Sequence, residues 1–182
     1  MTKYPSIVVC DLDDTLTITR QRRHLIERPD WATDAWEPDW ESYHACAHHD
    51  ELNIPVFHIV DALNSAGFKI YIWTARLDTY RKEAEEWLDN NSVPYMELRM
   101  KPAARATDDA NVVKGEWLWE LREEHSCLET VRTGTYRVPR LSINQYPSDA
   151  MIPLLAIDDR AKCAHWWREQ GTVCIDVAGN PF

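Results

Sequence analysis

A cluster of three carboxylates follows the first apolar run of the chain. Asp11, Asp13 and Asp14 come directly after residues 7–10, a run of the kind found in parallel strands buried on both faces. Strand alternation places Asp11 and Asp13 on the same side, where two ionised carboxylates raise each other's pKa unless a cation lies between them. Oxygen ligands of this kind suit Mg²⁺. The cluster therefore predicts a magnesium site in which one aspartate is a nucleophile and its near-neutral neighbour moves the proton. A surface turn rich in aspartate is the simpler alternative.

A second acidic pair, Asp158-Asp159, ends another apolar run, residues 154–157. This pair could supply a further carboxylate ligand to a hexacoordinate metal ion. The simpler alternative is that the pair caps the helix that follows. We expect both to hold, with one residue facing the metal and the other supporting the turn.

The elements that must position these side chains alternate between strands and helices. The apolar and β-rich runs predict strands at 7–10, 68–73, 95–98, 154–157 and 173–177, and helical spacing predicts helices at 56–66, 78–90, 108–124 and 161–170. This alternation predicts an α/β fold with a doubly wound parallel sheet, whose strands end along one edge. Three strands then bring polar residues to that edge, namely Asp11/Asp13, Thr74/Arg76 and Asp158/Asp159.

Two stretches interrupt the alternation. Residues 17–55 are rich in tryptophan, histidine and acidic side chains and show no clear strand, so we expect a helical cap inserted into a core made of residues 1–16 and 56–182. Residues 126–152 contain a pattern typical of a hairpin that turns near Gly134, which predicts an extra insertion in the core.

Composition narrows the classes further. The 182 residues suit one domain with a small insert, and the formal net charge of −10 argues against a protein that coats nucleic acid. No run of about 18 apolar residues exists to span a membrane, and the N-terminus lacks the layout of a signal peptide, so we expect a cytoplasmic protein. The five cysteines are widely spaced, which argues against a disulfide framework.

These motifs, in this order, resemble those of the haloacid dehalogenase (HAD) superfamily. The resemblance rests on Asp11-x-Asp13-x-Thr15, Thr74, Lys114 and Asp158-Asp159, and it covers the chain apart from residues 126–152. It implies a HAD-like (Rossmann-like) parallel sheet with helices on both faces, and a Mg²⁺-dependent phosphatase that acts through an aspartyl-phosphate.

A narrower resemblance connects the chain to the 3′-phosphatase domain of bacteriophage-type polynucleotide kinases. It is carried by Thr74-Ala75-Arg76, by the run from Asp108 to Lys114 and by residues 155–160. No Walker A motif is present, which implies a phosphatase domain that stands without the kinase. The resemblance also allows for a phage-encoded protein acting in the host cytoplasm. The sequence departs from the pattern at Asp14, where many HAD members have glycine, and at Thr74-Ala75, where the polynucleotide subgroup has Ser-Gly.

The resemblance assigns a role to each matching residue. Asp11 would be the nucleophile, Asp13 the acid and base, and Lys114 the cation that neutralises the aspartate and the phosphate, with Lys101 as the alternative lysine. The phosphate-binding residues would be Thr74, Arg76, Arg22 and Thr15. The magnesium ligands would be Asp11, the backbone carbonyl of Asp13, Asp158 and Asp159.

The implied substrate is a phosphorylated nucleotide or a nucleic-acid 3′ end. A phosphatase of free nucleoside monophosphates, a sugar-phosphate phosphatase and a non-catalytic HAD-like binding module are the alternatives, and nothing indicates a stable protein partner. Three tryptophans of residues 17–55 could form a stacking wall for a base or sugar, or pack a small cap core instead: Trp31, Trp36 and Trp40. His44 and His48 have zinc-ligand spacing, but no further ligand is evident, and a polar cap face is the simpler interpretation.

Overall fold

A parallel sheet of five strands forms the centre of the protein, which the computed structural model describes over residues 6–125, 153 and 155–177. The strand order is β5-β4-β1-β6-β7, and every neighbouring pair is parallel. The strands are β1 (Ile7–Cys10), β4 (Lys69–Leu77), β5 (Glu97–Lys101), β6 (Leu155–Asp158) and β7 (Val173–Asp176). The α/β class expected from the alternating pattern is therefore confirmed.

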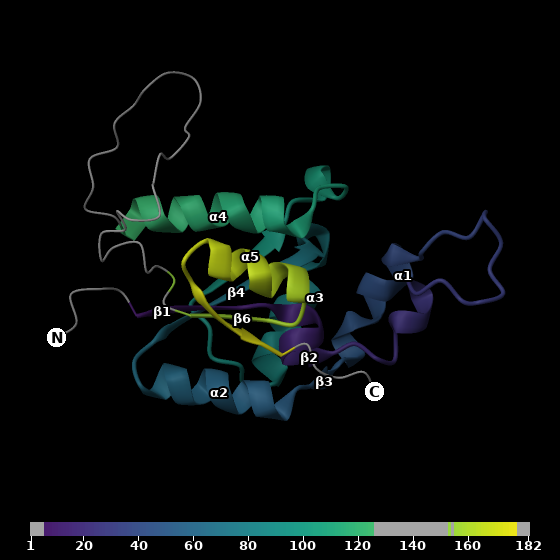
Figure 1. The fold of residues 1–182 in the computed structure, drawn as a ribbon. Helices are drawn as coiled ribbons and strands as arrows, with labels where there is room; N and C mark the ends of the chain where they lie inside the picture. The colour runs from purple at the N-terminus through teal and green to yellow at the C-terminus, as the bar shows by residue number, and fades with distance from the viewer. Residues whose placement is uncertain (1–5, 126–152, 154, 178–182) are drawn as a thin grey trace, which may run out of the picture.

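Helices cover both faces of this sheet, as Figure 1 shows for α4 and α5 on one side and α2 on the other. The helices of the core are α2 (Ile54–Ser65), α3 (Arg81–Asn90), α4 (Ala110–His125) and α5 (Ala161–Glu169). Alternate residues of β1 divide between the two layers. Val8 and Cys10 pack in one buried cluster with residues of α2 and α3, while Ile7 and Val9 pack in another with residues of α4 and α5. Full burial of a Val or Ile side chain stabilises the fold by about 1.5–3 kcal/mol, so β1 is held from both faces.

Most of the expected elements are confirmed, with boundary shifts that are largest in β4, β5 and α3. The strand expected at 95–98 is β5, which begins at Glu97. The strand expected at 68–73 is β4, which runs on to Leu77. The helix expected at 78–90 begins as a short 3₁₀ turn, η4 (Asp78–Tyr80), before α3. Gly67 follows the end of α2 and has φ +91°, a left-handed conformation that glycine adopts without strain.

Residues 17–55 contain two strands that the sequence pattern does not reveal. β2 (Thr17–Ile18) pairs antiparallel with β3 (Glu51–Leu52), so the two ends of the segment lie side by side. Between them come the short turns η2 (Arg23–Leu25) and η3 (Cys46–His49) and the helix α1 (Trp40–Ala45). Figure 1 shows α1 standing beside the sheet rather than on either face. We call residues 17–55 the cap segment below.

The hairpin expected at 126–152 lies outside the described residues. Within the described part of the chain, no helix is both long enough and apolar enough to cross a membrane.

Candidate active site

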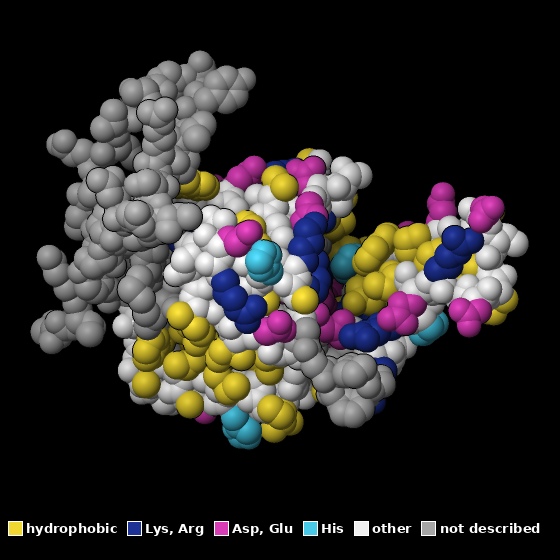
Figure 2. Space-filling model, viewed as in Figure 1, with side chains coloured by type: hydrophobic (Ala, Val, Ile, Leu, Met, Phe, Trp, Pro, Cys, Tyr) yellow, Lys and Arg dark blue, Asp and Glu magenta, His cyan; other side chains and the backbone are white. Residues whose placement is uncertain are grey.

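Three neighbouring strands of the sheet end at a cavity of about 670 Å³. β1 is followed by Asp11, whose backbone N–H donates to the carbonyl of Ile157 in β6 (2.9 Å). β4 brings Thr74 and Arg76 to the same edge, and Asp159 follows β6. In Figure 2 the cavity is the notch between the core and the cap segment, with acidic side chains deep inside it. The prediction that these strand ends form one polar edge is confirmed.

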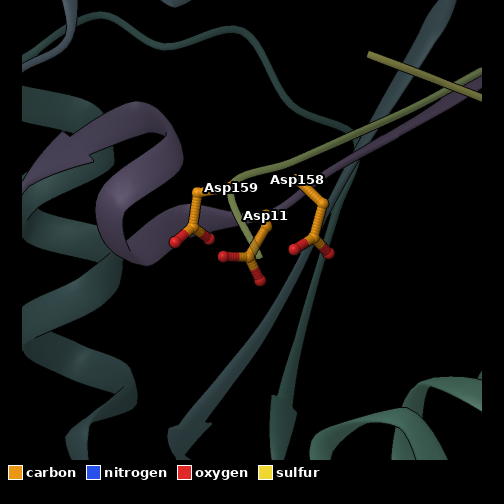
Figure 3. Close-up of side chains that lie close together, drawn as sticks. All are labelled: Asp11, Asp158 and Asp159. Carbon is orange, nitrogen blue, oxygen red and sulfur yellow. The ribbon is translucent and has the colours of Figure 1, made fainter. Parts of the chain in front are cut away.

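Three carboxylates lie close together beside the cavity, which Asp11 and Asp159 line (Figure 3). Asp11, Asp158 and Asp159 each offer an oxygen, and these oxygens lie within 4.8 Å of one another. Asp11 and Asp158 are buried. An all-oxygen set with two of its three members buried matches the ligands that Mg²⁺ prefers, so the residues fit a divalent cation.

Lys114 of α4 bridges two of these carboxylates. Its Nζ donates to Asp11 Oδ1 (2.6 Å) and to Asp158 Oδ2 (2.7 Å), and its side chain is buried. Burial disfavours the ammonium, but the two carboxylates outweigh this effect and raise the pKa of Lys114 above its ordinary range. The lysine is therefore a fixed positive charge. Lys101, the alternative lysine, donates instead to the backbone carbonyls of Ala106 and Asp108.

The acidic cluster holds more negative charge than Lys114 offsets. Burial raises the pKa of Asp11 to about 7; Lys114 lowers it, and Asp158 and Asp159 raise it further. Burial and Asp158 likewise raise the pKa of Asp159 to about 6. Raised carboxylate pKa values mean that the ionised cluster is costly by itself, and a bound cation would relieve that cost.

Asp13 has a different environment from Asp11. Its Oδ1 accepts from Arg22 Nη2 (2.5 Å) and from Arg76 Nη2 (2.6 Å), and its Oδ2 accepts from the Thr74 hydroxyl (3.4 Å). Burial alone would raise the pKa of Asp13, but the two guanidinium groups hold it well below its ordinary range. The expectation of a near-neutral Asp13 considered only the repulsion from Asp11, whereas these two arginines favour the ionised form of Asp13.

Asp50 is a buried acid that the sequence reasoning did not single out for this site. Arg22 donates to it from Nε (2.7 Å) and Nη2 (2.5 Å), and Arg76 Nη2 lies 3.8 Å from its Oδ2. Both arginines are about 1% exposed. Two buried carboxylates, those of Asp13 and Asp50, thus balance two buried guanidinium groups, an arrangement that avoids an unpaired buried charge. Asp50 directly follows residues 44–49 in the sequence, and nothing in that position indicates an ion pair with Arg22.

The backbone around these residues is also specialised. Asp14 has φ +59°, and its Oδ1 accepts from the Thr19 hydroxyl (2.5 Å) and pairs with Arg23 (3.0 Å). Thr15 donates to Asp159 Oδ1 (3.3 Å) and so faces the acidic cluster. The register between β4 and β5 shifts between Thr74 and Leu77, so the strand pairing is irregular where β4 reaches the cavity.

The cap segment supplies an aromatic wall to the cavity. Trp40, Tyr43 and His44 of α1 line it together with Ile26. Trp31 does not line the cavity and is 82% exposed, and Trp36 is also absent from its lining. Of the three tryptophans expected to form a wall, only Trp40 is placed to do so.

The histidines of the cap segment form no metal site among the described residues, where the aspartate trio is the one candidate. His48 Nδ1 contacts the carbonyl of Ala45 (2.8 Å), and the rings of His48 and His49 lie against each other. The simpler interpretation, a polar cap face, agrees with the exposed His48 and His49, whereas His44 is buried.

Among known proteins, only solved structures are similar to this chain. No protein-family model matches the sequence, and no curated protein is significantly similar to it. Among solved structures, a chain of the Pnkp1/Rnl/Hen1 RNA repair complex is similar over the whole of this chain, with a TM-score of 0.62 and 22% identity. A protein of Clostridium difficile, proposed to be a phosphatase, matches over 98% of this chain and 88% of its own length, with a TM-score of 0.61 and 12% identity. A hydrolase from Streptococcus pneumoniae matches with a TM-score of 0.51 and 14% identity, over 98% of this chain and 94% of its own.

The chain has the HAD-like fold. The fold expected from the resemblance is therefore confirmed. The chain spans 45% of the length of the RNA repair chain that it matches. At these identities the likeness concerns the fold alone.

Proposed function

We propose that this protein is a Mg²⁺-dependent phosphomonoesterase in which Asp11 is the nucleophile. The observation that carries the proposal is the division of charge in the cavity: Asp11 is held by Lys114 beside Asp158 and Asp159, while Asp13 is held by two arginines. This arrangement matches the needs of phosphoryl transfer, which depends on fixed positive charge and positioned donors more than on covalent help from the protein.

The first step transfers the phosphoryl group to Asp11. A carboxylate oxygen of Asp11 forms a bond to phosphorus, and the bond from phosphorus to the ester oxygen breaks. The leaving oxygen takes a proton from Asp13, which can carry one once Arg22 and Arg76 have turned from its carboxylate to the phosphoryl oxygens. Thr74, Arg76 and Arg22 donate hydrogen bonds to the phosphoryl oxygens, and Thr15 supports Asp159.

The second step releases phosphate. Asp13, now ionised, takes a proton from a water molecule whose oxygen attacks the phosphorus of the aspartyl-phosphate. The bond to Asp11 breaks, inorganic phosphate leaves and the carboxylate of Asp11 is restored. Lys114 stays protonated throughout and keeps Asp11 in place. Mg²⁺, held by Asp11, Asp158, Asp159 and the carbonyl of Asp13, would supply positive charge against the phosphoryl oxygens.

The proposed substrate is a nucleic-acid 3′ end or a nucleotide. Two observations support this class. The chain shares its fold with part of a protein in an RNA repair complex. The cavity also carries cationic side chains on its core side, where Lys101, Arg160 and Lys162 line it. The net charge of −10 does not oppose this class, because capture of one terminal phosphate needs only local positive charge.

The test is phosphate release with Mg²⁺ and with EDTA, from p-nitrophenyl phosphate, 3′- and 5′-mononucleotides, a sugar phosphate and a 3′-phosphorylated oligonucleotide. We expect Mg²⁺-dependent release that is fastest with the 3′-phosphates. Asp11→Asn should abolish release while the protein stays folded. Asp109→Asn is the matched control, because Asp109 also lines the cavity but pairs with Lys162 at its rim.

Each other outcome has a clear meaning. Retained turnover in Asp11→Asn would refute the nucleophile. Fastest release from 5′-mononucleotides would assign a nucleotidase, and equal release from the sugar phosphate would refute the nucleotide class. No release from any substrate by the folded protein would favour a non-catalytic binding module.

A further inference from the structure

The two walls of the cavity differ in chemistry. Figure 2 shows apolar side chains on the cap side of the notch and Lys or Arg atoms on the core side, with acidic side chains between them. The acidic residues between the two walls and the arginines have roles in the proposed phosphatase reaction, but the apolar side chains of the cap wall have none. A phosphate group alone would leave that wall in contact with water. Exposed apolar surface beside a binding site indicates a ligand that covers it.

Trp40 is the main part of this wall. It lines the cavity and is 52% exposed, which is a large fraction for an aromatic side chain at a concave site. Its ring lies nearly parallel to that of His44, with an interplanar angle of 24° and ring centroids 6.0 Å apart. His44 in turn contacts the ring of Tyr80 at 5.1 Å. We call Trp40 and His44 the aromatic shelf.

His44 gives a second, independent sign of a ligand. It is only 9% exposed, and its Nδ1 atom is buried with no hydrogen-bond partner among the described residues. Burial and the nearby cations lower the pKa of His44 to about 4, against the raising effect of Asp13, so the ring is neutral near pH 7. An unpaired buried polar atom is costly, and because His44 lines the cavity, a small turn of its ring would let a polar group of a ligand at the shelf offset that cost.

The shelf is tied to the proposed phosphate site. The guanidinium of Arg22 lies 3.9 Å from the centre of the Tyr43 ring and donates to the Tyr43 carbonyl (3.1 Å). The Trp40 ring contacts that of Tyr43 edge-on, at 5.7 Å. Because Arg22 also binds Asp13, this chain of contacts fixes the shelf relative to the reacting atoms.

We propose that the aromatic shelf binds the nucleobase of the nucleotide whose phosphate is removed. This inference rests on the proposed function and narrows its substrate. A nucleobase has the flat π face that Trp40 can stack on and the edge polar groups that a neutral His44 can meet. Stacking of this kind tolerates any base, so the shelf would select a nucleotide without selecting a sequence.

The experiment compares two tryptophans of the same cap segment. Trp40→Ala removes the shelf, and Trp31→Ala is the matched control, because Trp31 lies outside the cavity lining and is 82% exposed. Each variant is assayed with a 3′-mononucleotide and with glycerol 2-phosphate, which has no ring. Loss of one base stack predicts a fall in kcat/KM of roughly 5- to 150-fold for the nucleotide. Release from glycerol 2-phosphate should change less than about twofold, and Trp40→Phe should restore most of the loss.

Three results would overturn the shelf. One is an equal loss on both substrates, which would make Trp40 a structural residue. Another is a nucleotide activity of Trp40→Ala equal to that of Trp31→Ala. The third is a preference for phosphotyrosine over the nucleotide that Trp40→Ala abolishes, which would assign the shelf to a phenol ring. If the unmodified protein acts on neither the nucleotide nor glycerol 2-phosphate, the proposed phosphatase function itself fails, and the two failures are therefore distinguishable.

Discussion

Replacement of Lys114 by methionine tests whether the acidic cluster depends on a cation. Methionine keeps most of the length of the lysine stem but removes the ammonium that bonds to Asp11 and Asp158. Both carboxylates are buried, at 4% and 0% exposure, so neither can recover its lost partner from bulk water. Breaking a buried pair by removing one partner costs about 3–5 kcal/mol. In a domain of this size each kcal/mol shifts Tm by about 2–4 °C, so Lys114→Met should melt roughly 6–20 °C below the unmodified protein in EDTA.

The matched control is Lys162→Met. Lys162 also pairs with an aspartate, Asp109, but its side chain is 73% exposed. Exposed pairs contribute about 0–1 kcal/mol, so this variant should melt within a few degrees of the unmodified protein.

The assay is thermal unfolding followed by circular dichroism at pH 8, in EDTA and in excess Mg²⁺. Mg²⁺ should raise the Tm of Lys114→Met more than that of the unmodified protein, because the cation finds a cluster that lacks its lysine. If Lys114→Met and Lys162→Met melt within 2 °C of each other in EDTA, the reasoning about the buried cluster is refuted.

Three further predictions concern other parts of the site. Asp50→Asn leaves two buried arginines short of one carboxylate, so it should lower the free energy of unfolding by about 3–5 kcal/mol, and inorganic phosphate should raise its Tm more than that of the unmodified protein. Burial raises the pKa of Asp11 to about 7, so in EDTA this group makes the fold less stable as pH rises from about 4 to about 7. His44 makes the fold more stable over the same rise in pH, because burial lowers its pKa. The effect of Asp11 is therefore measured as the difference in pH dependence between Asp11→Asn and the unmodified protein in urea unfolding. An identical pH dependence in the two proteins would contradict this. Asp14→Gly should lose no more than about 1–2 kcal/mol and Asp14→Val clearly more, measured by the same unfolding, because valine is strained at φ +59°.

The central strands and helices could be predicted because their buried faces require apolar residues, which appear in the sequence as runs or with helical spacing. β1 and β6 are short apolar runs that end at aspartates, and the structure places their ends within one residue of the expectation. The expected start of β5 is two residues too early, because Tyr95 and Met96 are apolar residues of the kind found in strands. The strand itself begins at Glu97. β2 and β3 were missed because two residues are too few to show a period of two.

The candidate site divides in the same way. Asp11, Asp158 and Asp159 could be found because each lies at or just after the end of a strand of one parallel sheet, and such strands end at a common edge. Lys114 lies 103 positions from Asp11 and was found by resemblance alone. Nothing in the spacing of the chain indicates that α4 turns this lysine toward β1.

The contact between Asp50 and Arg22 is an example of an ion pair that no sequence pattern indicates. Arg22 lies 28 positions from Asp50 across the cap segment, and the two meet because β2 pairs with β3 and brings the ends of the segment together. The same pairing places Arg22 against Asp13, so the cap segment contributes half of the positive charge on that carboxylate. A change that loosens the β2–β3 pair would therefore reach the reacting residues without touching them. The cap segment is thus part of the site's electrostatics as well as its wall, and this is why the pKa of Asp13 could not be reasoned from Asp11 and Asp13 alone.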